Sequence, residues 1–414
     1  MEHQVLSGVS AEAPPVSGEF AFTRLERVIF GPGCISRLGQ ELQLRSVERA
    51  VIVTGKSLSR SELLSRVREA VGGCCAGVFA GTAQHAPGET VRALTRELER
   101  LDADAVVSFG GGSAIDSAKV AAASLMNGRD MVAEASGLKL ADAFRPTERG
   151  RELLHIAVPT TLSAAEMTPG GGVTDTKTRV KQGVVDPRLQ PKVVIYDPEL
   201  TRDTPDWLWV ATGMRALDHA IEAAYSVRHQ GFVDALATQA IELLRRHLPA
   251  SLGPWDAVRI AHRGECQIAA WCSLYGGFNT GLGLSHAMGH QIGPMWNIPH
   301  GVTSCITLAH AMRFMASVVP ERFGPIARGL GIGFDAADAR TAAGNCADRV
   351  QRFIAGFDVP HSLREAGLRR EDLQRVARAI HAEVEELGAI GRPMTLEEVT
   401  AVLAAAFEGT PAAR

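Results

Sequence analysis

Residues 103–125, ADAVVSFGGGSAIDSAKVAAASL, join a short apolar run to three consecutive glycines and a helical pattern. The run from Ala103 to Phe109 predicts a strand, and Ala114 to about Leu125 predicts a helix. Glycines let backbone amides approach an anion closely, and the start of a helix adds the positive end of its dipole. The stretch therefore predicts a strand, a phosphate-binding turn and a helix, as in an open α/β sheet.

The predicted turn consists of Gly110, Gly111, Gly112 and Ser113. Ser113 and Asp116 have capping-box spacing, which predicts that the helix begins directly after Ser113. The Lys-Ser/Thr pair of an ATP-hydrolysing loop is missing, so the pattern favours pyrophosphate binding over phosphoryl transfer. A tight turn without a ligand remains the alternative.

Similar strand and helix signals surround this unit. Strands are predicted at residues 28–30, 50–55, 77–81, 154–158 and 192–196, and helices at 62–70 and 89–101. After the first strand, Gly31-Pro32-Gly33 partly imitates a dinucleotide motif, but Ser36 replaces its third glycine, so a simple turn is the better interpretation.

The loop after the strand at 154–158 is rich in hydroxyl groups. It contains Thr160, Thr161, Ser163 and Thr168 and is followed by glycines at 170–172. A loop at the carboxyl end of a strand is where an open α/β sheet binds its ligand. We expect this segment to line the site.

Strand signals nearly vanish after about residue 200, and helix periodicity broken by Gly and Pro continues to Arg414. A chain of 414 residues exceeds one comfortable core, so two domains are expected. The predicted organisation is a flexible tail at 1–19, an α/β domain at 20–204 and a helical domain at 205–414.

Composition and charge restrict the class of protein. A net charge of −3 gives no case for nucleic acid or an anionic membrane. No apolar run approaches the ~18 residues that a membrane span needs, and the first 18 residues lack the features of a signal peptide. Seven cysteines without a C-x-x-C pair indicate reduced thiols. A cytoplasmic protein is expected.

Residues 281–301 hold three histidines. His286 and His290 are four residues apart and would share one helix face, which we expect to end at Gly293-Pro294. His300 lies in a predicted turn that could return it towards them. Converging imidazoles suit a divalent metal or proton transfer, whereas unrelated capping or core histidines are the alternative.

Two further details of the sequence bear on this chemistry. Ala287 stands where the zinc-protease helix needs Glu, which excludes peptide hydrolysis on that pattern. On an earlier predicted helix, Arg215 and His219 are one turn apart and share a face. A solvated amphipathic helix is the alternative for that segment.

Taken in order, these segments resemble the iron-containing (group III) alcohol dehydrogenase family, whose fold is shared with dehydroquinate synthase and glycerol dehydrogenase. The resemblance implies an α/β nucleotide-binding domain, an all-α C-terminal domain, and a cleft between them for NAD(P) and substrate. Its motifs run through about residues 20–315: Phe30-Gly-Pro-Gly33, Gly110-Gly-Gly-Ser113 with Asp116 and Lys119, Pro159-Thr-Thr161, Tyr196-Asp-Pro198, Thr212-Gly-Met214, His219-Ala-Ile-Glu222, His286 with His290, and His300-Gly301.

Within the family the chain is most similar to the maleylacetate reductases, through Phe79-Ala-Gly81, Gln84-His-Ala-Pro87 and Glu166-Met-Thr-Pro169. Those enzymes reduce a carbon–carbon double bond of maleylacetate to give 3-oxoadipate during the breakdown of aromatic compounds. The resemblance thus implies a small carboxylate substrate and a homodimer.

The resemblance also implies cofactor contacts. Gly110 to Ser113, with Asp116, would hold the pyrophosphate, and Thr160, Thr161 and Leu162 would line the nicotinamide side. Many NAD-preferring relatives carry an Asp after the second strand, where this chain has Gly55. Without that carboxylate a 2′-phosphate is not repelled, so NADPH should be tolerated beside NADH.

One departure from the family pattern concerns the metal. His219, His286 and His300 match the three histidine ligands of iron or zinc, but Arg215 stands where metal-dependent relatives have Asp. A guanidinium cannot be a ligand and repels a cation, so we expect a missing or weakened metal site. Asp218 is adjacent to His219 but was expected to point about 100° away from it.

The hypothesis from these residues is a reductase whose iron or zinc site is missing or weakened. Arg215 would replace the metal as a fixed positive charge that holds a substrate carboxylate or stabilises an enolate, and His290 would donate the proton. Three alternatives stay open: a metal-dependent alcohol or aldehyde dehydrogenase, a lyase like dehydroquinate synthase, and an inactive nucleotide-binding protein.

Overall fold

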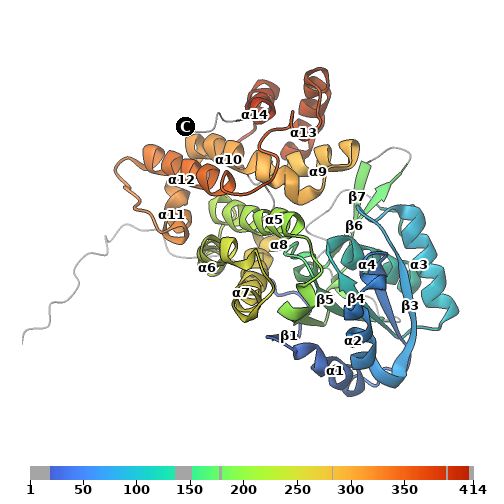
Figure 1. Cartoon of the computed structure of the whole chain (residues 1–414). Helices are drawn as coiled ribbons and strands as arrows, with labels where there is room; N and C mark the ends of the chain where they lie inside the picture. The colour runs from blue at the N-terminus through green and yellow to red at the C-terminus, as the bar shows by residue number, and fades with distance from the viewer. Residues whose placement is uncertain (1–18, 136–151, 177–179, 282, 388–389, 410–414) are drawn as a thin grey trace, which may run out of the picture.

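The computed structural model describes residues 19–135, 152–176, 180–281, 283–387 and 390–409. The predicted flexible tail therefore lies outside the described residues, except for its last residue. The described part contains a parallel sheet covered by helices and a larger all-helical half, as predicted (Figure 1).

The N-terminal half is built on a six-stranded sheet in which every neighbouring pair is parallel. The strands lie in the order β1-β8-β5-β4-β2-β3. Their bounds are β1 Arg27–Phe30, β2 Ala50–Gly55, β3 Cys75–Thr82, β4 Ala105–Gly110, β5 Leu154–Pro159 and β8 Val193–Tyr196. Each lies on or within two residues of a predicted strand.

Helices cover both faces of this sheet, which explains why the central strands are continuous apolar runs. Alternate residues of β2 point to opposite sides: Val51 and Val53 belong to one core and Ile52 to the other. On the first side lie α3 Gly88–Arg100 and α4 Gly112–Asn127, and on the second lie α1 Leu38–Leu44 and α2 Glu62–Val71.

All secondary structure described after residue 205 is helical, in agreement with the prediction. The central element is α5, which is almost entirely buried after its first turn. None of the described helices has both the length and the apolar character needed to cross a bilayer. The helices are α5 Asp206–Tyr225, α6 Gly231–His247, α7 Ala257–Leu274, α8 Gly277–Thr280, α9 Leu284–Trp296, α10 His300–Val318, α11 Gly324–Leu330, α12 Ala339–Ile354, α13 Leu373–Leu387 and α14 Leu396–Glu408.

A hairpin occupies part of the segment that was predicted to be only a loop. Strands β6 Gly170–Asp175 and β7 Val180–Val185 pair antiparallel, separate from the main sheet. In Figure 1 the hairpin rises from the α/β half towards α9, against which β7 packs. The hairpin therefore connects the two halves at the side of the cleft.

The prediction that α4 starts after Ser113 with a capping box was wrong. The helix begins at Gly112, and its N-cap is Gly111, which has no side chain to cap it. The Ser113 hydroxyl instead accepts a hydrogen bond from the backbone N–H of His85 at 3.2 Å. The first amides of α4 are thus left without a side-chain cap.

The prediction that Gly293-Pro294 ends the histidine helix was also wrong. Helix α9 continues through Pro294 to Trp296 and ends where Asn297 adopts a left-handed conformation, φ 55°. Proline removes one backbone donor but does not prevent the next turn. His300 then begins α10 directly after Pro299, so it belongs to a helix start and not only to a turn.

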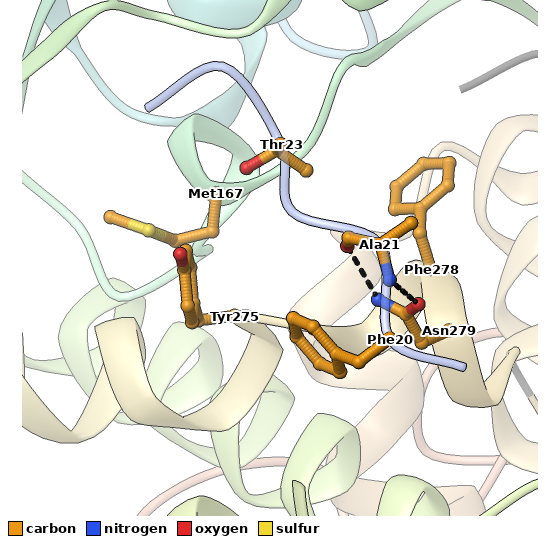
Figure 2. A pocket seen from close by; sticks show the side chains of 8 residues that line it. Phe20, Ala21, Thr23, Met167, Tyr275, Phe278 and Asn279 are labelled. Carbon is orange, nitrogen blue, oxygen red and sulfur yellow. Dashed lines mark hydrogen bonds between the residues drawn. The ribbon is translucent and has the colours of Figure 1, made fainter. Parts of the chain in front are cut away.

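The first described residues form a strap, residues 20–23, that lies on the helical half (Figure 2). The side-chain amide of Asn279 accepts from the N–H of Ala21 at 2.8 Å and donates to its carbonyl at 3.1 Å. Phe20 packs edge-on against Phe232, with ring centroids 5.1 Å apart. The adjoining residues Gly277 and Phe278 line the large cleft, so the strap supports one of its walls.

Candidate active site

A cleft of about 1630 Å³ lies between the carboxyl ends of the strands and the helical half. This volume exceeds that of a site for one drug-sized ligand, ~300–1,000 Å³, and suits a dinucleotide together with a substrate. The cleft is lined by most of the predicted site residues: Gly110, Gly111, Gly112, Ser113, Asp116, Thr160, Thr161, Arg215, His219, His286, His290 and His300.

Leu162 is the predicted site residue that the structure places elsewhere. Its side chain is fully buried in the core of the helical half, and its backbone N–H donates to Thr212 Oγ1 at 3.1 Å. The apolar side chain of Leu162 turns inwards, while Thr160 and Thr161 before it and Ser163 after it line the cleft. Leu162 therefore fixes the loop to α5 and does not line the site.

The nucleotide end of the cleft is built mainly from backbone. A Cβ atom on Gly111 would lie 3.0 Å from Thr161 Cγ2, and one on Gly112 would lie 3.0 Å from Ser163 Oγ. No acidic residue stands in the first turn of α4, so the positive end of the helix is not neutralised. Thr161 Oγ1 is buried without a hydrogen-bond partner among the described residues, as expected for a group that faces a ligand.

The opposite end of the cleft is built from side chains of α5. Arg215, Asp218 and Glu222 are spaced three and four residues apart and lie on one buried helix face. Asp218 Oδ2 lies 3.4 Å from Arg215 Nη1 and accepts from the hydroxyls of Ser285 at 2.8 Å and Ser304 at 2.6 Å. Asp218, which the sequence predicts to point about 100° away from His219, thus pairs with Arg215 one helical turn earlier.

Glu222 fixes the first of the three histidines on α9 and α10. Its Oε2 lies 2.6 Å from His286 Nδ1, and its two oxygens also accept from the N–H groups of Gly283 and Ser285 at the start of α9. The carboxylate thus caps this helix and leaves His286 Nε2 facing away from it.

The predicted histidines come together as a cluster. Ring centroids are 4.8 Å apart for His219 and His286, 6.3 Å for His286 and His300, and 5.2 Å for His290 and His300. Burial, together with the charge of Arg215, lowers the pKa values of His219, His286 and His300 well below the ordinary value. These three imidazoles are therefore neutral near pH 7.

His290 has a different environment. It faces the cleft with 17% of its side chain exposed, and its Nδ1 lies 2.6 Å from Glu383 Oε1 of α13. Its ring lies nearly parallel to that of His300, with an interplanar angle of 8°. His290 is thus partly exposed in the cleft, where its partner is Glu383.

Comparison with known proteins follows the same division of the chain. The sequence model of the iron-containing alcohol dehydrogenase family matches residues 26–198. The sequence model of the C-terminal part of that family matches residues 209–407. Lactaldehyde reductase of Escherichia coli is 31% identical over 90% of this chain and 96% of its own length. The chain belongs to the iron-containing alcohol dehydrogenase family.

Relatives with different activities match at nearly the same level. The maleylacetate reductase of Sphingobium indicum is 29% identical over 93% of this chain and 96% of its own length. A 1,3-propanediol oxidoreductase structure is 29% identical with a TM-score of 0.84, over 94% of this chain and all of its own. A maleylacetate reductase structure from Rhizobium sp. strain MTP-10005 is 26% identical with a TM-score of 0.74, over 95% of this chain and 99% of its own. The protein is thus an oxidoreductase family member whose substrate class these likenesses leave open.

The family's name implies a metal, and the histidine cluster offers part of a site. His219 Nδ1, His286 Nε2 and His300 Nε2 are buried without hydrogen-bond partners among the described residues. However, Arg215 is buried beside them, and burial lowers its pKa only to about 10, so it stays charged. A divalent cation here would face that guanidinium across a medium of low dielectric constant.

Nor do the three histidine nitrogens converge. Among the described residues, the group whose ligand atoms lie within 4.8 Å of one another is Asp218, Glu222 and His286. Both Glu222 oxygens accept hydrogen bonds, and Asp218 Oδ2 accepts from two hydroxyls and lies 3.4 Å from Arg215 Nη1, while Asp218 Oδ1 has no hydrogen-bond partner among the described residues. The charge of Arg215 at this distance repels a divalent cation. The residues present therefore do not fit a divalent metal, and we derive no catalytic step through one.

Sequence reasoning missed two carboxylates of this site. Glu222 lies seven residues after Arg215, so its position on the same helix face could have been found from spacing. Glu383 lies in α13, far from every motif, and no local pattern indicates its contact with His290.

Proposed function

We propose that this protein is an NAD(P)H-dependent reductase of the maleylacetate type, which reduces a carbon–carbon double bond of an unsaturated dicarboxylate to give 3-oxoadipate. The observation that carries the proposal is the buried, charged Arg215 beside the histidine cluster, at the position where metal-dependent relatives hold a ligand. A fixed cation at this place favours an anionic substrate over a neutral alcohol.

Arg215 has donors left for a substrate. Its Nη1 is directed to Asp218 at 3.4 Å and Ser304 at 3.3 Å. Neither Nη2 nor Nε makes a hydrogen bond to any residue in the part of the chain that the structure describes, and the residue lines the cleft. Two parallel N–H groups of a guanidinium can hold a carboxylate in bidentate fashion.

The chemistry needs one hydride, which bound NAD(P)H supplies, and one proton. Addition of hydride to a double bond conjugated with a carbonyl leaves an enolate, whose negative charge Arg215 stabilises. His290 then gives a proton to the α-carbon from Nε2, since its Nδ1 is engaged with Glu383. The net change is two electrons and two hydrogens added across the double bond.

Cofactor selection follows from the loop after β2. Gly55, Lys56 and Ser57 line the cleft, and this loop has no carboxylate. A 2′-phosphate would meet a cation and a hydroxyl there. We therefore propose that NADPH is accepted as well as NADH.

A metal-dependent alcohol or aldehyde dehydrogenase is the second candidate. The three unpartnered imidazole nitrogens favour it, as do relatives such as the lactaldehyde reductase of Escherichia coli and the 1,3-propanediol dehydrogenase of Citrobacter freundii, which is 32% identical.

One experiment separates these candidates. The purified protein is treated with a chelator, and oxidation of NADH and NADPH is followed with maleylacetate and with lactaldehyde. Turnover of maleylacetate by the chelated protein supports the proposal. Activity that returns only with added iron or zinc assigns the second candidate, and nucleotide binding without turnover of either substrate indicates a binding protein.

Arg215→Asp provides a matched test of the same question. It restores the carboxylate at the ligand position and removes the cation. We expect loss of maleylacetate reduction, because the cation that would hold the anionic substrate is removed. Full activity on the acid in this variant would contradict the proposed role of Arg215.

A further inference from the structure

Glu383 joins two segments that are distant in the sequence. Its Oε1 lies 2.6 Å from His290 Nδ1, and its Oε2 accepts from Gln291 Nε2 at 2.7 Å. Both oxygens of this carboxylate therefore contact consecutive residues of α9, more than 90 positions earlier in the chain. The carboxylate is largely buried, with 18% of the side chain exposed, which strengthens both contacts.

The first contact determines which nitrogen of His290 is protonated in the neutral ring. An ionised carboxylate can only accept, so His290 Nδ1 carries a hydrogen and donates it to Glu383. Nε2 is then the nitrogen that can exchange a proton with a bound molecule. The parallel ring of His300, 5.2 Å away, limits tilting of the imidazole plane.

The shape of α13 supports this arrangement. Ala379, Ala382 and Glu383 line the cleft from one face of the helix. Helix α13 packs against α9, which carries His290. The carboxylate is thus the group of this helix face that can form hydrogen bonds within the cleft.

We propose that Glu383 is a positioning residue for proton transfer, which fixes the tautomer and orientation of His290. This inference rests on the proposed function, in which His290 donates the proton. It assigns the C-terminal α13 a part in the chemistry, through a residue that does not itself touch the substrate.

The first test does not depend on turnover. Histidine labelled with ¹⁵N is incorporated into the full chain, and the His290 signals are assigned by their loss in His290→Ala. We expect the Nδ1–H tautomer in the unchanged protein and its loss or exchange with the other tautomer in Glu383→Ala. An unchanged His290 spectrum in Glu383→Ala overturns the proposal, whatever substrate the enzyme uses.

The second test is kinetic, with the substrate that the chelated protein turns over. Glu383→Ala should lower kcat about 10- to 100-fold, within the range of general acid–base effects, while the KM for the nucleotide changes less than about twofold. Glu383→Gln keeps an acceptor of the same size for Nδ1–H and should recover part of the loss. It also serves as the test variant if the alanine protein does not fold.

A double-mutant cycle distinguishes positioning from general support of the fold. In the His290→Ala background, Glu383→Ala should cause no further loss of kcat, whereas an additive loss overturns the proposal. Glu385→Gln removes the same charge from an exposed position of α13 and should leave kcat unchanged. If His290→Ala alone retains full activity, the proton donor of the proposed function is wrong, and the tautomer measurement still decides the role of Glu383.

Discussion

The two ends of the cleft are made in different ways. At the nucleotide end, the Gly110–Ser113 turn offers backbone amides and the start of α4, and its neighbours are close in sequence or in adjacent strands. At the histidine end, charged and polar side chains from α5, α9, α10 and α13 are held by one another. The first end depends on the absence of side chains, and the second depends on their pairing.

This difference has a consequence for mutation. The backbone turn is limited by the space around its glycines, whereas the side-chain cluster can change its charge through one substitution. Arg215 is the cation of that cluster, and a substitution there changes its charge while the rest of α5 stays the same. Substitutions at the two ends should therefore differ in kind as well as in size.

Arg215→Met should have the largest effect. We expect kcat/KM for maleylacetate to fall about 100- to 1,000-fold, because the charge that stabilises the enolate is lost. The Kd of the nucleotide, measured by fluorescence titration, should stay within about twofold. Retention of more than a tenth of kcat/KM would mean that the histidine end does not depend on its cation.

Arg322→Met is the matched control for that variant. Arg322 is also mostly buried and paired with a carboxylate, Asp234 at 2.8 Å, but it lies outside the cleft. We expect it to lower stability to thermal unfolding without lowering kcat/KM.

Gly111→Ala tests the nucleotide end. The added Cβ would lie 3.0 Å from Thr161 Cγ2 and 3.2 Å from its Oγ1, so the turn must open or the threonine must move. We expect the Kd of NADPH to rise about tenfold, a cost of ~1.4 kcal/mol. Gly344→Ala, where a Cβ meets nothing within 4 Å on α12, should leave the Kd unchanged. Equal Kd values in the two variants would show that the cradle is not used.

Gly55→Asp tests whether the loop after β2 determines the choice between NADH and NADPH. A carboxylate after β2 should raise the Kd of NADPH about two- to fivefold through repulsion of the 2′-phosphate at a partly exposed site. The Kd of NADH should not rise, and it serves as the internal control. A parallel rise for both nucleotides would indicate steric damage and not charge recognition.

Ser113→Ala should have the smallest effect. Its hydroxyl accepts from the N–H of His85 and does not cap α4, so we expect a loss of about 0.5–1.5 kcal/mol in the free energy of unfolding. Hydrogen exchange at the start of α4 should stay unchanged. In contrast, Ser61→Ala removes the real side-chain cap of α2 and should speed exchange in that helix.

The strands could be predicted because sheets covered on both faces need continuous apolar runs, as in residues 50–55 and 105–110. The hairpin β6–β7 could not be predicted because its glycines and charged residues show no alternation of polar and apolar residues. Its two strands are stabilised by pairing with each other, which neither strand shows in its own sequence. The predicted end of α9 is wrong because a proline such as Pro294 removes only one backbone N–H donor, and the helix continues through it.

The part of the site that could be predicted consists of residues close together in the sequence. His286 and His290 lie on one helix, and Arg215 and His219 lie on another, so the helical period predicts that each pair shares a face. The direction of Asp218 relative to its neighbour His219 does not indicate its partner, which is Arg215, one helical turn earlier. Glu383 reaches the site only because α13 packs on α9, which is a tertiary contact without a local signal.

The strap at residues 20–23 has a consequence for how the chain is assembled. Ala21 and Asn279, which form two hydrogen bonds with each other, are 258 positions apart, so the strap is synthesised well before the residue that holds it. Contacts of such long sequence separation form late in folding, because closing the loop costs entropy before any contact compensates for it. During folding the strands and helices of the α/β half can therefore pair before residues 20–23 dock on the helical half. Since Phe278 adjoins Asn279 and lines the cleft, docking of the strap is the step that completes this wall.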